Sequence, residues 1–383
     1  MPKAPEFLIV LALVLLVSAC ASPVRPTPTP AWTPAPAFTS TLTADEQSAI
    51  QIEAALTALN EKNLFSGSVL IARDGHILLS QGYGLADIEQ QIPNTPQTKF
   101  RIGSVSKQFT ATAILILQHQ GKLKVKDPIC KYIDNCPAAW QRTTIHHLLT
   151  HTSGIYNITN SVDYLNFKKR TLSPDQIMDL FRDLPLDFNP GERWSYSNSG
   201  YILLGAIIEK TSGRPFASFL QQNILDPLQM KDSGYDESRP TIQNHGVGYK
   251  GATAEADYID MSIPFSAGAL YSTVADLYKW DQALYTEKLL PAAERDQAFL
   301  PYVQMSGLIS YGYGWMIGKQ FDQTWIMHAG GIAGFVSIIN RFPDSQTTII
   351  LLSNHENTNL GAVMTTIAPM LFGGGTWINP GFS

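Results

Sequence analysis

Apolar residues form short runs near both ends of the chain and spaced, helix-like patterns between them. The runs predict five strands, at 64–72, 76–81, 324–327, 335–342 and 347–353. Asp74-Gly75 predicts a tight hairpin turn after the first strand, and Pro343-Asp344-Ser345 predicts a turn between the last two. Both ends of the folded chain are therefore expected to supply strands.

Periodic apolar positions in the middle of the chain predict helices at 104–118, 146–149, 174–182, 201–210 and 273–284, and a closing helix is predicted at 360–371. Strands at both ends with helices between them favour an α/β (α+β) fold. In it, N- and C-terminal strands form one antiparallel sheet that is flanked by helices and carries a mostly helical subdomain. We expect one domain over 45–372, followed by a C-terminal tail at 373–383.

The N-terminus has the pattern of an export signal. Lys3 precedes an apolar run at 7–17, which as a helix would span about 16 Å. A bilayer core is about 30 Å thick, so this run is too short to cross it. Val17-Ser18-Ala19-Cys20 resembles a bacterial lipobox, which implies a signal peptide over 1–19 and a lipid on the Cys20 sulfur. The alternative is an ordinary cleaved signal peptide with a chance cysteine.

A Pro- and Thr-rich linker at 20–44 follows, with six prolines that favour an extended stalk. We expect an exported protein that is lipid-anchored to the cell membrane on its extracytoplasmic side. Cys130 and Cys136 are the other cysteines, and an exported chain lies where disulfides persist, so we expect them to pair. Metal ligation by these two thiols is the competing interpretation.

Composition excludes some classes of function. Of the 383 residues, 44% are hydrophobic and 15% are charged, which supports a large core and excludes a disordered chain. The net charge is −5 with no run of Lys or Arg, so nucleic acid is not an expected partner. His146, His147 and His151 could suggest a metal site, but no nearby carboxylate completes it, and we expect neither a metal nor an organic cofactor.

Ser104-Val105-Ser106-Lys107 is the chain's one Ser-x-x-Lys sequence, at the start of an apolar helix. The serine and lysine at i and i+3 share a helix face, and a helix N-terminus favours negative charge developing on a substrate carbonyl. Taken alone the motif is weak, because a serine at a helix start is also an ordinary cap.

Two further segments carry candidate chemistry. Tyr196-Ser197-Asn198 lies in a turn directly ahead of a predicted helix, where a side chain can project into a cleft. The other Tyr-x-Asn, at Tyr164, is interpreted as surface because lysines follow it. His328 ends a predicted strand and is followed by Ala329-Gly330-Gly331; a lone histidine in such a place is usually structural.

In this order the three segments resemble the serine β-lactamase and penicillin-binding protein family, in its branch of class C β-lactamases, D,D-carboxypeptidases and related esterases. Four supporting stretches match too: Phe100-Arg101-Ile102-Gly103-Ser104, Leu148-Leu149-Thr150-His151-Thr152-Ser153-Gly154, Ala267-Gly268-Ala269-Leu270-Tyr271-Ser272-Thr273 and Tyr311-Gly312-Tyr313-Gly314-Trp315. The resemblance implies a β-lactamase/transpeptidase-like fold.

It also implies roles. Ser104 would be the nucleophile and Lys107 its partner. Tyr196 would take the serine proton while Lys107 holds it near-anionic, and the two would titrate as a pair. Asn198 would bind a substrate amide or orient Lys107.

On the third segment, His328 would face a substrate carboxylate or assist proton transfer. The N–H groups of Ser104 and Gly331 would form an oxyanion hole, and small residues at Gly330 and Gly331 would let substrate approach the strand. Relatives that destroy β-lactams carry Lys-Thr-Gly here, and this chain does not.

The expected function is therefore a serine acyl hydrolase acting through an acyl-enzyme on D-amino-acid peptides or amides, cell-wall peptides among them, or small esters. The alternatives are a penicillin-recognising sensor with slow turnover, a true β-lactamase, or a scaffold that keeps a pocket.

Overall fold

The computed structural model describes residues 42–238 and 241–379. All the described residues belong to one compact unit. The expected signal peptide, Cys20 and nearly all of the proline-rich linker lie outside the described residues. Within the part that is described, no helix is long and apolar enough to cross a membrane.

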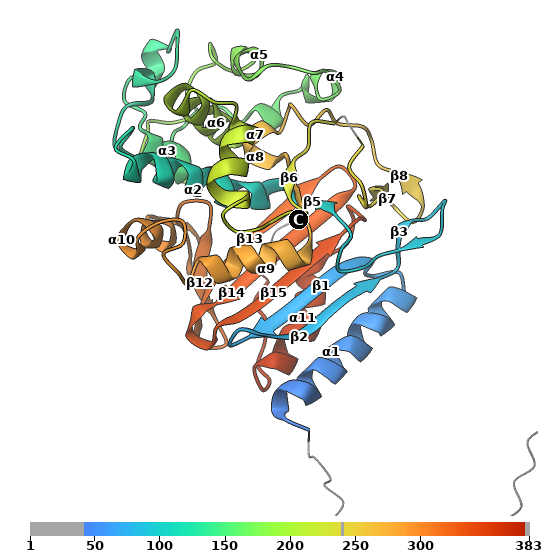
Figure 1. The fold of residues 1–383 in the computed structure, drawn as a ribbon. Coiled ribbons are helices and arrows are strands. Elements are labelled where there is room, and N and C mark those ends of the chain that lie inside the picture. The colour runs from blue at the N-terminus through green and yellow to red at the C-terminus, as the bar shows by residue number, and fades with distance from the viewer. Residues whose placement is uncertain (1–41, 239–240, 380–383) are drawn as a thin grey trace, which may run out of the picture. The chain divides into compact units, whose positions relative to one another are not determined.

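One antiparallel sheet of eight strands, in the order β10-β11-β12-β13-β14-β15-β1-β2, forms the centre of the fold (Figure 1). Its strands are β1 (Gly67–Arg73), β2 (His76–Tyr83), β10 (Val303–Ser306), β11 (Ile309–Tyr311), β12 (Met316–Gln320), β13 (Gln323–Ile332), β14 (Phe335–Phe342) and β15 (Thr347–Ser353). β1 pairs with β15 from Gly67 opposite Ser353 to Ala72 opposite Thr348. The sheet is thus closed by joining the two ends of the chain, and the predicted fold class is confirmed.

The central strands are buried on both faces, which explains their unbroken apolar sequences. Along β1, Val69 and Ile71 pack with α1 (Ala44–Glu61) and α11 (Leu360–Leu371). Leu70 and Ala72 point the other way, into a core shared with α2 (Ser106–His119), α6 (Asn198–Ser212) and α9 (Val274–Ala283). In Figure 1, α9 crosses one face of the sheet and α11 lies behind it.

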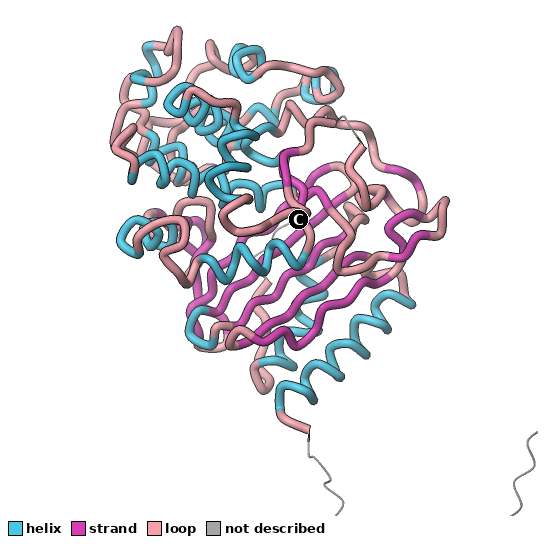
Figure 2. Tube along the Cα trace, in the orientation of Figure 1, coloured by secondary structure: helices cyan, strands magenta, loops and turns pink. Residues whose placement is uncertain are grey.

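The helical subdomain gathers on one side of the sheet (Figure 2). Every residue of α2 from Ser106 to Leu117 is buried, as expected for a helix that is packed on all sides. The remaining helices are α3 (Ile145–Leu149), α4 (Tyr164–Phe167), α5 (Pro174–Asp179), α7 (Phe216–Leu220), α8 (Phe265–Gly268) and α10 (Ala292–Arg295). Short helical turns are η1 (Gly103–Val105), η2 (Ile129–Lys131), η3 (Ala138–Trp140), η4 (Ile158–Asn160), η5 (Gln221–Leu225), η6 (Asp296–Phe299) and η7 (Pro343–Ser345).

A small sheet of order β5-β9-β6 links the subdomain to the main sheet. Its strands are β5 (Phe100–Arg101), β6 (Gly234–Tyr235) and β9 (Leu270–Ser272), and two further pairs are β3 (Leu85–Asp87) with β4 (Ile92–Pro93) and β7 (Tyr249–Lys250) with β8 (Ala254–Glu255). β5 matters for function because the chain passes from it directly into the turn that carries Ser104.

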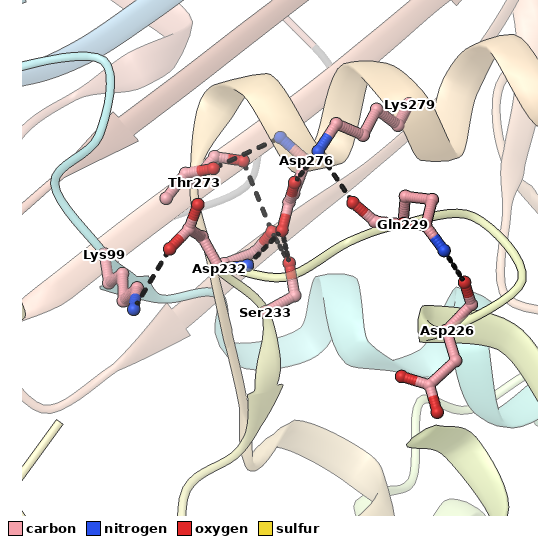
Figure 3. A network of polar contacts seen from close by, with 9 residues as sticks. Lys99, Asp226, Gln229, Asp232, Ser233, Thr273, Asp276 and Lys279 are labelled. Atoms are coloured by element: carbon pink, nitrogen blue, oxygen red, sulfur yellow. Dashed lines mark hydrogen bonds and ion pairs between the residues drawn. The ribbon is translucent and has the colours of Figure 1, made fainter. Parts of the chain in front are cut away.

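Buried Asp276, on α9, is the centre of a hydrogen-bond network beside this small sheet (Figure 3). Its Oδ2 accepts hydrogen bonds from the backbone N–H of Asp232 (2.7 Å) and the hydroxyl of Ser233 (2.9 Å), and Lys279 donates to its Oδ1 at 2.7 Å. Lys99, next to β5, pairs with Asp232 at 3.2 Å. The network therefore ties α9 to the segments that lead into β5 and β6.

Three features differ from the sequence expectations or extend them. α1 was not predicted, yet it begins at Ala44 behind a capping box formed by Thr43 and Glu46. The tail after 372 is not simply a free end, since Trp377 is buried against the core that holds α11. A disulfide joins Cys130 and Cys136, as the sequence led us to expect.

Candidate active site

Ser104 lies in the tight turn η1, one turn ahead of α2 and not within it. Gly103 has a φ of +47°, and a Cβ there would lie 2.9 Å from the backbone nitrogen of Gly331 on β13. Only glycine fits both requirements. This packing brings the turn that carries Ser104 directly against β13.

Lys107 is fully buried one helical turn after Ser104. Its Nζ lies 3.0 Å from Ser104 Oγ, 2.8 Å from Asn198 Oδ1 and 2.8 Å from the carbonyl oxygen of Ala267. Burial lowers the pKa of Lys107 well below its ordinary value. A neutral amine has two N–H donors, which satisfy the amide and carbonyl oxygens, and its lone pair is then left for the proton of Ser104.

Tyr196 is the second side chain in hydrogen-bond contact with Ser104. Its hydroxyl donates a hydrogen bond of 2.8 Å to Ser104 Oγ, and its ring lies 4.9 Å from the Lys107 Nζ. Burial raises the pKa of Tyr196, and the hydrogen bond with Ser104 offsets this only in part. The resting Tyr196 is therefore a phenol, which differs from the near-anionic state expected from the sequence.

Asn198 occupies the first turn of α6, two residues after Tyr196. Its Oδ1 accepts from Lys107, and its Nδ2 donates to the hydroxyl of Thr159 at 3.2 Å. Of its two expected roles, orienting Lys107 is the one that these contacts provide.

Tyr164 is not a surface residue, contrary to our interpretation of the sequence. It is half-buried, its ring contacts Phe167 edge-on, and it lines a cavity beside Ser104. The polar residues around it suggested exposure, but α4 folds back so that Tyr164 packs against the cluster containing Ile259 and Met261.

His328 lies in the middle of β13, because the strand continues to Ile332. Its Nδ1 lies 2.6 Å from the carbonyl oxygen of Ala329, and its Nε2 lies 2.9 Å from the hydroxyl of Tyr311. Burial is the main cause that lowers the pKa of His328 to about 3. A buried, neutral imidazole gives no positive charge for a substrate carboxylate, so the anchoring role has no support in this geometry.

A chain of hydrogen bonds connects His328 to His151, for which the sequence suggested no catalytic role. The backbone N–H of Ser197 donates to His151 Nδ1 at 3.1 Å, so a neutral His151 carries its proton on Nε2. That Nε2 lies 3.2 Å from the Tyr311 hydroxyl, which can in turn donate to His328 Nε2. His151 and Tyr311 belong to stretches that matched the family, but their 160-residue separation hides the contact.

Gly330 and Gly331 are needed for different reasons. A Cβ on Gly330 would lie 2.1 Å from the carbonyl oxygen of Ile102 and 3.0 Å from the nitrogen of Ser104, so this glycine lets β13 pack on the serine turn. A Cβ on Gly331 would meet nothing within 4 Å. Both glycines line the larger cavity at Ser104, but only at Gly331 does the position of a Cβ face open space.

Two cavities meet at Ser104. The smaller, of about 290 Å³, is lined by Asn198, Gly331, Tyr164 and a set of isoleucines. The larger, of about 770 Å³, is lined by Tyr196, His328, Gly331, Trp194 and Glu356. Ser104, Gly331 and Glu356 border both, so a bound acyl compound can reach to either side of the serine. Across the residues described, no group of three or more His, Cys, Asp or Glu is placed to hold a metal ion.

The sheet, the helical subdomain and the cluster of Ser104, Lys107 and Tyr196 define a serine hydrolase. The chain belongs to the Beta-lactamase family, whose model matches residues 51–368. It is 32% identical over 337 residues to penicillin-binding protein 4* of Bacillus subtilis (strain 168). The aligned region covers 82% of this chain and 74% of that protein.

Solved structures agree with this assignment. A penicillin-binding protein from Bacillus halodurans superposes with a TM-score of 0.75 at 28% identity, covering 82% of this chain and 98% of that one. A D-stereospecific amidohydrolase from Streptomyces sp. superposes with a TM-score of 0.67 at 27% identity, covering 82% and 94%.

Proposed function

We propose that Ser104 is the nucleophile of an acyl-enzyme hydrolase that acts on D-amino-acid amides or peptides, or on small esters. The observation that carries the proposal is the position of Ser104 Oγ, between the Lys107 Nζ at 3.0 Å and the Tyr196 hydroxyl at 2.8 Å. A serine hydroxyl is a weak nucleophile until an adjacent base takes its proton, and the neutral Lys107 amine is a base within reach of Ser104.

In acylation, the neutral Lys107 amine takes the Ser104 proton as Oγ attacks the substrate carbonyl carbon. The backbone N–H groups of Ser104 and Gly331, which border the cavities, receive the negative charge that develops on the carbonyl oxygen. Tyr196, a phenol at rest, donates its proton to the leaving amine or alkoxide as the C–N or C–O bond breaks. Lys107 keeps the serine proton, and Tyr196 stays a phenolate, until the acyl group is hydrolysed.

In deacylation, a water molecule attacks the ester carbonyl carbon of the acyl-enzyme. The Tyr196 phenolate takes the proton of that water, and Lys107 returns its proton to Ser104 Oγ as the acid product leaves. Because the groups are coupled, apparent pKa values from a rate profile belong to the Lys107–Tyr196 pair and not to either residue.

The substrate class rests on two observations. The similar Streptomyces protein is described as a D-stereospecific amidohydrolase. In addition, His328 stands on β13 where relatives carry the lysine of Lys-Thr-Gly, and this histidine is neutral. Amides and esters without a carboxylate beside the scissile bond suit such a site better than β-lactams do.

A slow penicillin-recognising protein is the second candidate, because the similar Bacillus proteins are described as penicillin-binding proteins. Both functions use the same acylation step and differ in deacylation. Cell-wall peptides, which carry a carboxylate beside the scissile bond, are the natural substrates that we propose for this second candidate.

We further propose an exported protein, held at the membrane by a lipid on Cys20. The lipobox-like sequence and the proline-rich linker support this location, with a signal peptide over 1–19, a linker over 20–44 and the hydrolase domain over 45–372.

The functional test is a substrate panel with purified protein: a D-amino-acid amide, a D-Ala-D-Ala peptide, a neutral ester and a chromogenic β-lactam. We expect turnover of the amide or the ester that is lost in Ser104→Ala and retained in Ser106→Ala, which changes the serine two residues further on, at the start of α2. Rapid turnover of the β-lactam would favour a true β-lactamase, and a single stoichiometric burst would favour the sensor. Turnover that survives Ser104→Ala would overturn the proposal.

A further inference from the structure

Glu356 lies just beyond β15, where the two cavities meet. Its Oε2 accepts a hydrogen bond of 2.8 Å from the backbone N–H of Gly334, in the turn between β13 and β14. This contact leaves the other carboxylate oxygen, Oε1, without a hydrogen bond among the described contacts. The carboxylate is thus fixed at the boundary of the space that Ser104 and Gly331 also border.

The charge around this space is negative. In the larger cavity Glu356 is the one carboxylate, no Lys or Arg is among the described lining residues, and His328 is neutral. In the smaller cavity Lys168 is the one cation, and it is already paired with Asp257 at 3.6 Å. Glu356 forms no ion pair with any described residue. A carboxylate left without a cation in a cleft favours a positively charged ligand.

The smaller cavity, beside this charge, has a largely apolar lining. Its lining includes Ile158, Ile202, Ile259, Ile263 and Ile332. An acyl group with an apolar side chain can bury that side chain here while its carbonyl carbon stays at Ser104. A substituent on the atom next to the carbonyl then lies close to the shared border, where Glu356 is fixed.

We infer that Glu356 is the specificity-determining residue of this site and that it binds a free, protonated amino group on the acyl side of the scissile bond. The substrates would be aminoacyl amides or esters with an apolar side chain and an unblocked amine. N-acylated compounds, and compounds with a carboxylate in place of the amine, would bind poorly. The inference rests on the proposed function, because it needs Ser104 to attack the acyl carbonyl.

The test compares kcat/KM for D-phenylalanine amide with kcat/KM for N-acetyl-D-phenylalanine amide, with the L-enantiomers run in parallel. Glu356→Gln removes the charge but keeps an oxygen that can accept from Gly334. Glu294→Gln on α10 is the matched control, because Glu294 lines neither cavity and pairs with His119 on the surface.

We expect the unmodified enzyme to prefer the free amine by at least about tenfold, which an ion pair in a cleft readily supplies. Glu356→Gln should remove most of this preference, mainly through a higher KM for the free amine, whereas Glu294→Gln should keep it. No preference in the unmodified enzyme, or an equal loss on both substrates in Glu356→Gln, would overturn the inference. A neutral ester that is hydrolysed only when Ser104 is intact separates this failure from a failure of the proposed function.

Discussion

Lys107 and Tyr196 show how burial sets the chemistry of single residues in this site. The same loss of water lowers the pKa of the amine and raises the pKa of the phenol, so each favours its neutral form. A neutral amine next to a serine hydroxyl is a base, and a neutral phenol on the other side is an acid. The resting site therefore holds the groups that acylation needs without any separated charge.

Tyr196→Phe tests whether the Tyr196 hydroxyl acts as the acid, because it removes only that one oxygen atom. It removes the hydroxyl that donates to Ser104 and leaves the ring packed against His151. We expect kcat to fall by roughly 10²–10⁴-fold, the usual contribution of a positioned acid or base, with little change in the unfolding free energy.

Tyr164→Phe is its control, since that hydroxyl has no assigned role although the residue lines the smaller cavity. Equal effects of the two substitutions on kcat would contradict a catalytic role for the Tyr196 hydroxyl.

At the scale of elements, the sequence predicted the parts that obey local rules. The bounds of β14, β15 and α11 agree with the predicted ranges, because each is an apolar segment ended by turn-forming residues. α1 escaped prediction because it buries only Ile52 and Leu56, so its apolar stripe is weak. The edge strand β10 and its neighbour β11 are only 4 and 3 residues long, which leaves no distinct pattern.

The same reasoning explains what the sequence indicated of the site. Ser104 and Lys107 are one helical turn apart, so a local rule was enough to predict their contact. The order of motifs then led to Tyr196, Asn198 and His328, which the structure brings to the same place. Contacts made only through the tertiary fold, such as His151 with Tyr311, have no local signature.

A buried ion pair holds α9 to the sheet. Asp281 on α9 pairs with Arg341 on β14, and it also accepts a hydrogen bond of 2.6 Å from the Thr348 hydroxyl on β15. Asp281→Ala would leave Arg341 charged and buried without a partner, at a cost of about 3–5 kcal/mol in unfolding free energy.

Urea unfolding measures this cost. Asp296→Ala is the matched control, because Asp296 pairs with Arg295 at the surface and such pairs contribute about 0–1 kcal/mol. A loss below about 1 kcal/mol in Asp281→Ala would show that the pair does not hold the two elements together.

At the scale of the whole molecule, we expect two buried and two partly buried histidines to set the response to acid. Burial lowers the pKa of His146 and of His245 to about 4 and that of His328 to about 3, and it lowers the pKa of His151 well below its ordinary value. The unfolded chain, with histidine pKa values near 6.5, binds more protons than the folded one between about pH 6.5 and pH 4.

Stability should therefore be greatest above about pH 6.5 and should fall as the pH drops towards 4. Unfolding midpoints in urea, measured at intervals from pH 7.5 to 4.5, test this directly. A midpoint that stays constant or rises over that range would mean that these histidines are not held neutral in the folded protein.

The proposed membrane location concerns the whole chain and depends on one residue, Cys20. Cys20→Ser removes the sulfur that would carry the lipid, so the protein should leave the membrane fraction or accumulate as an uncleaved precursor. Fractionation of expressing cells, with Cys130→Ser as a variant that keeps Cys20, makes the measurement. A mature, lipid-free protein in cells that express the unmodified chain would contradict the proposed anchor.

The central claim is that catalysis passes through a covalent ester on Ser104. The most direct measurement is mass spectrometry of the protein after rapid acid quenching with an ester substrate, a penicillin or a fluorophosphonate probe. The account predicts one adduct per chain, on the peptide that contains Ser104, and none in Ser104→Ala. An adduct on another residue, or an unchanged adduct in Ser104→Ala, would contradict it.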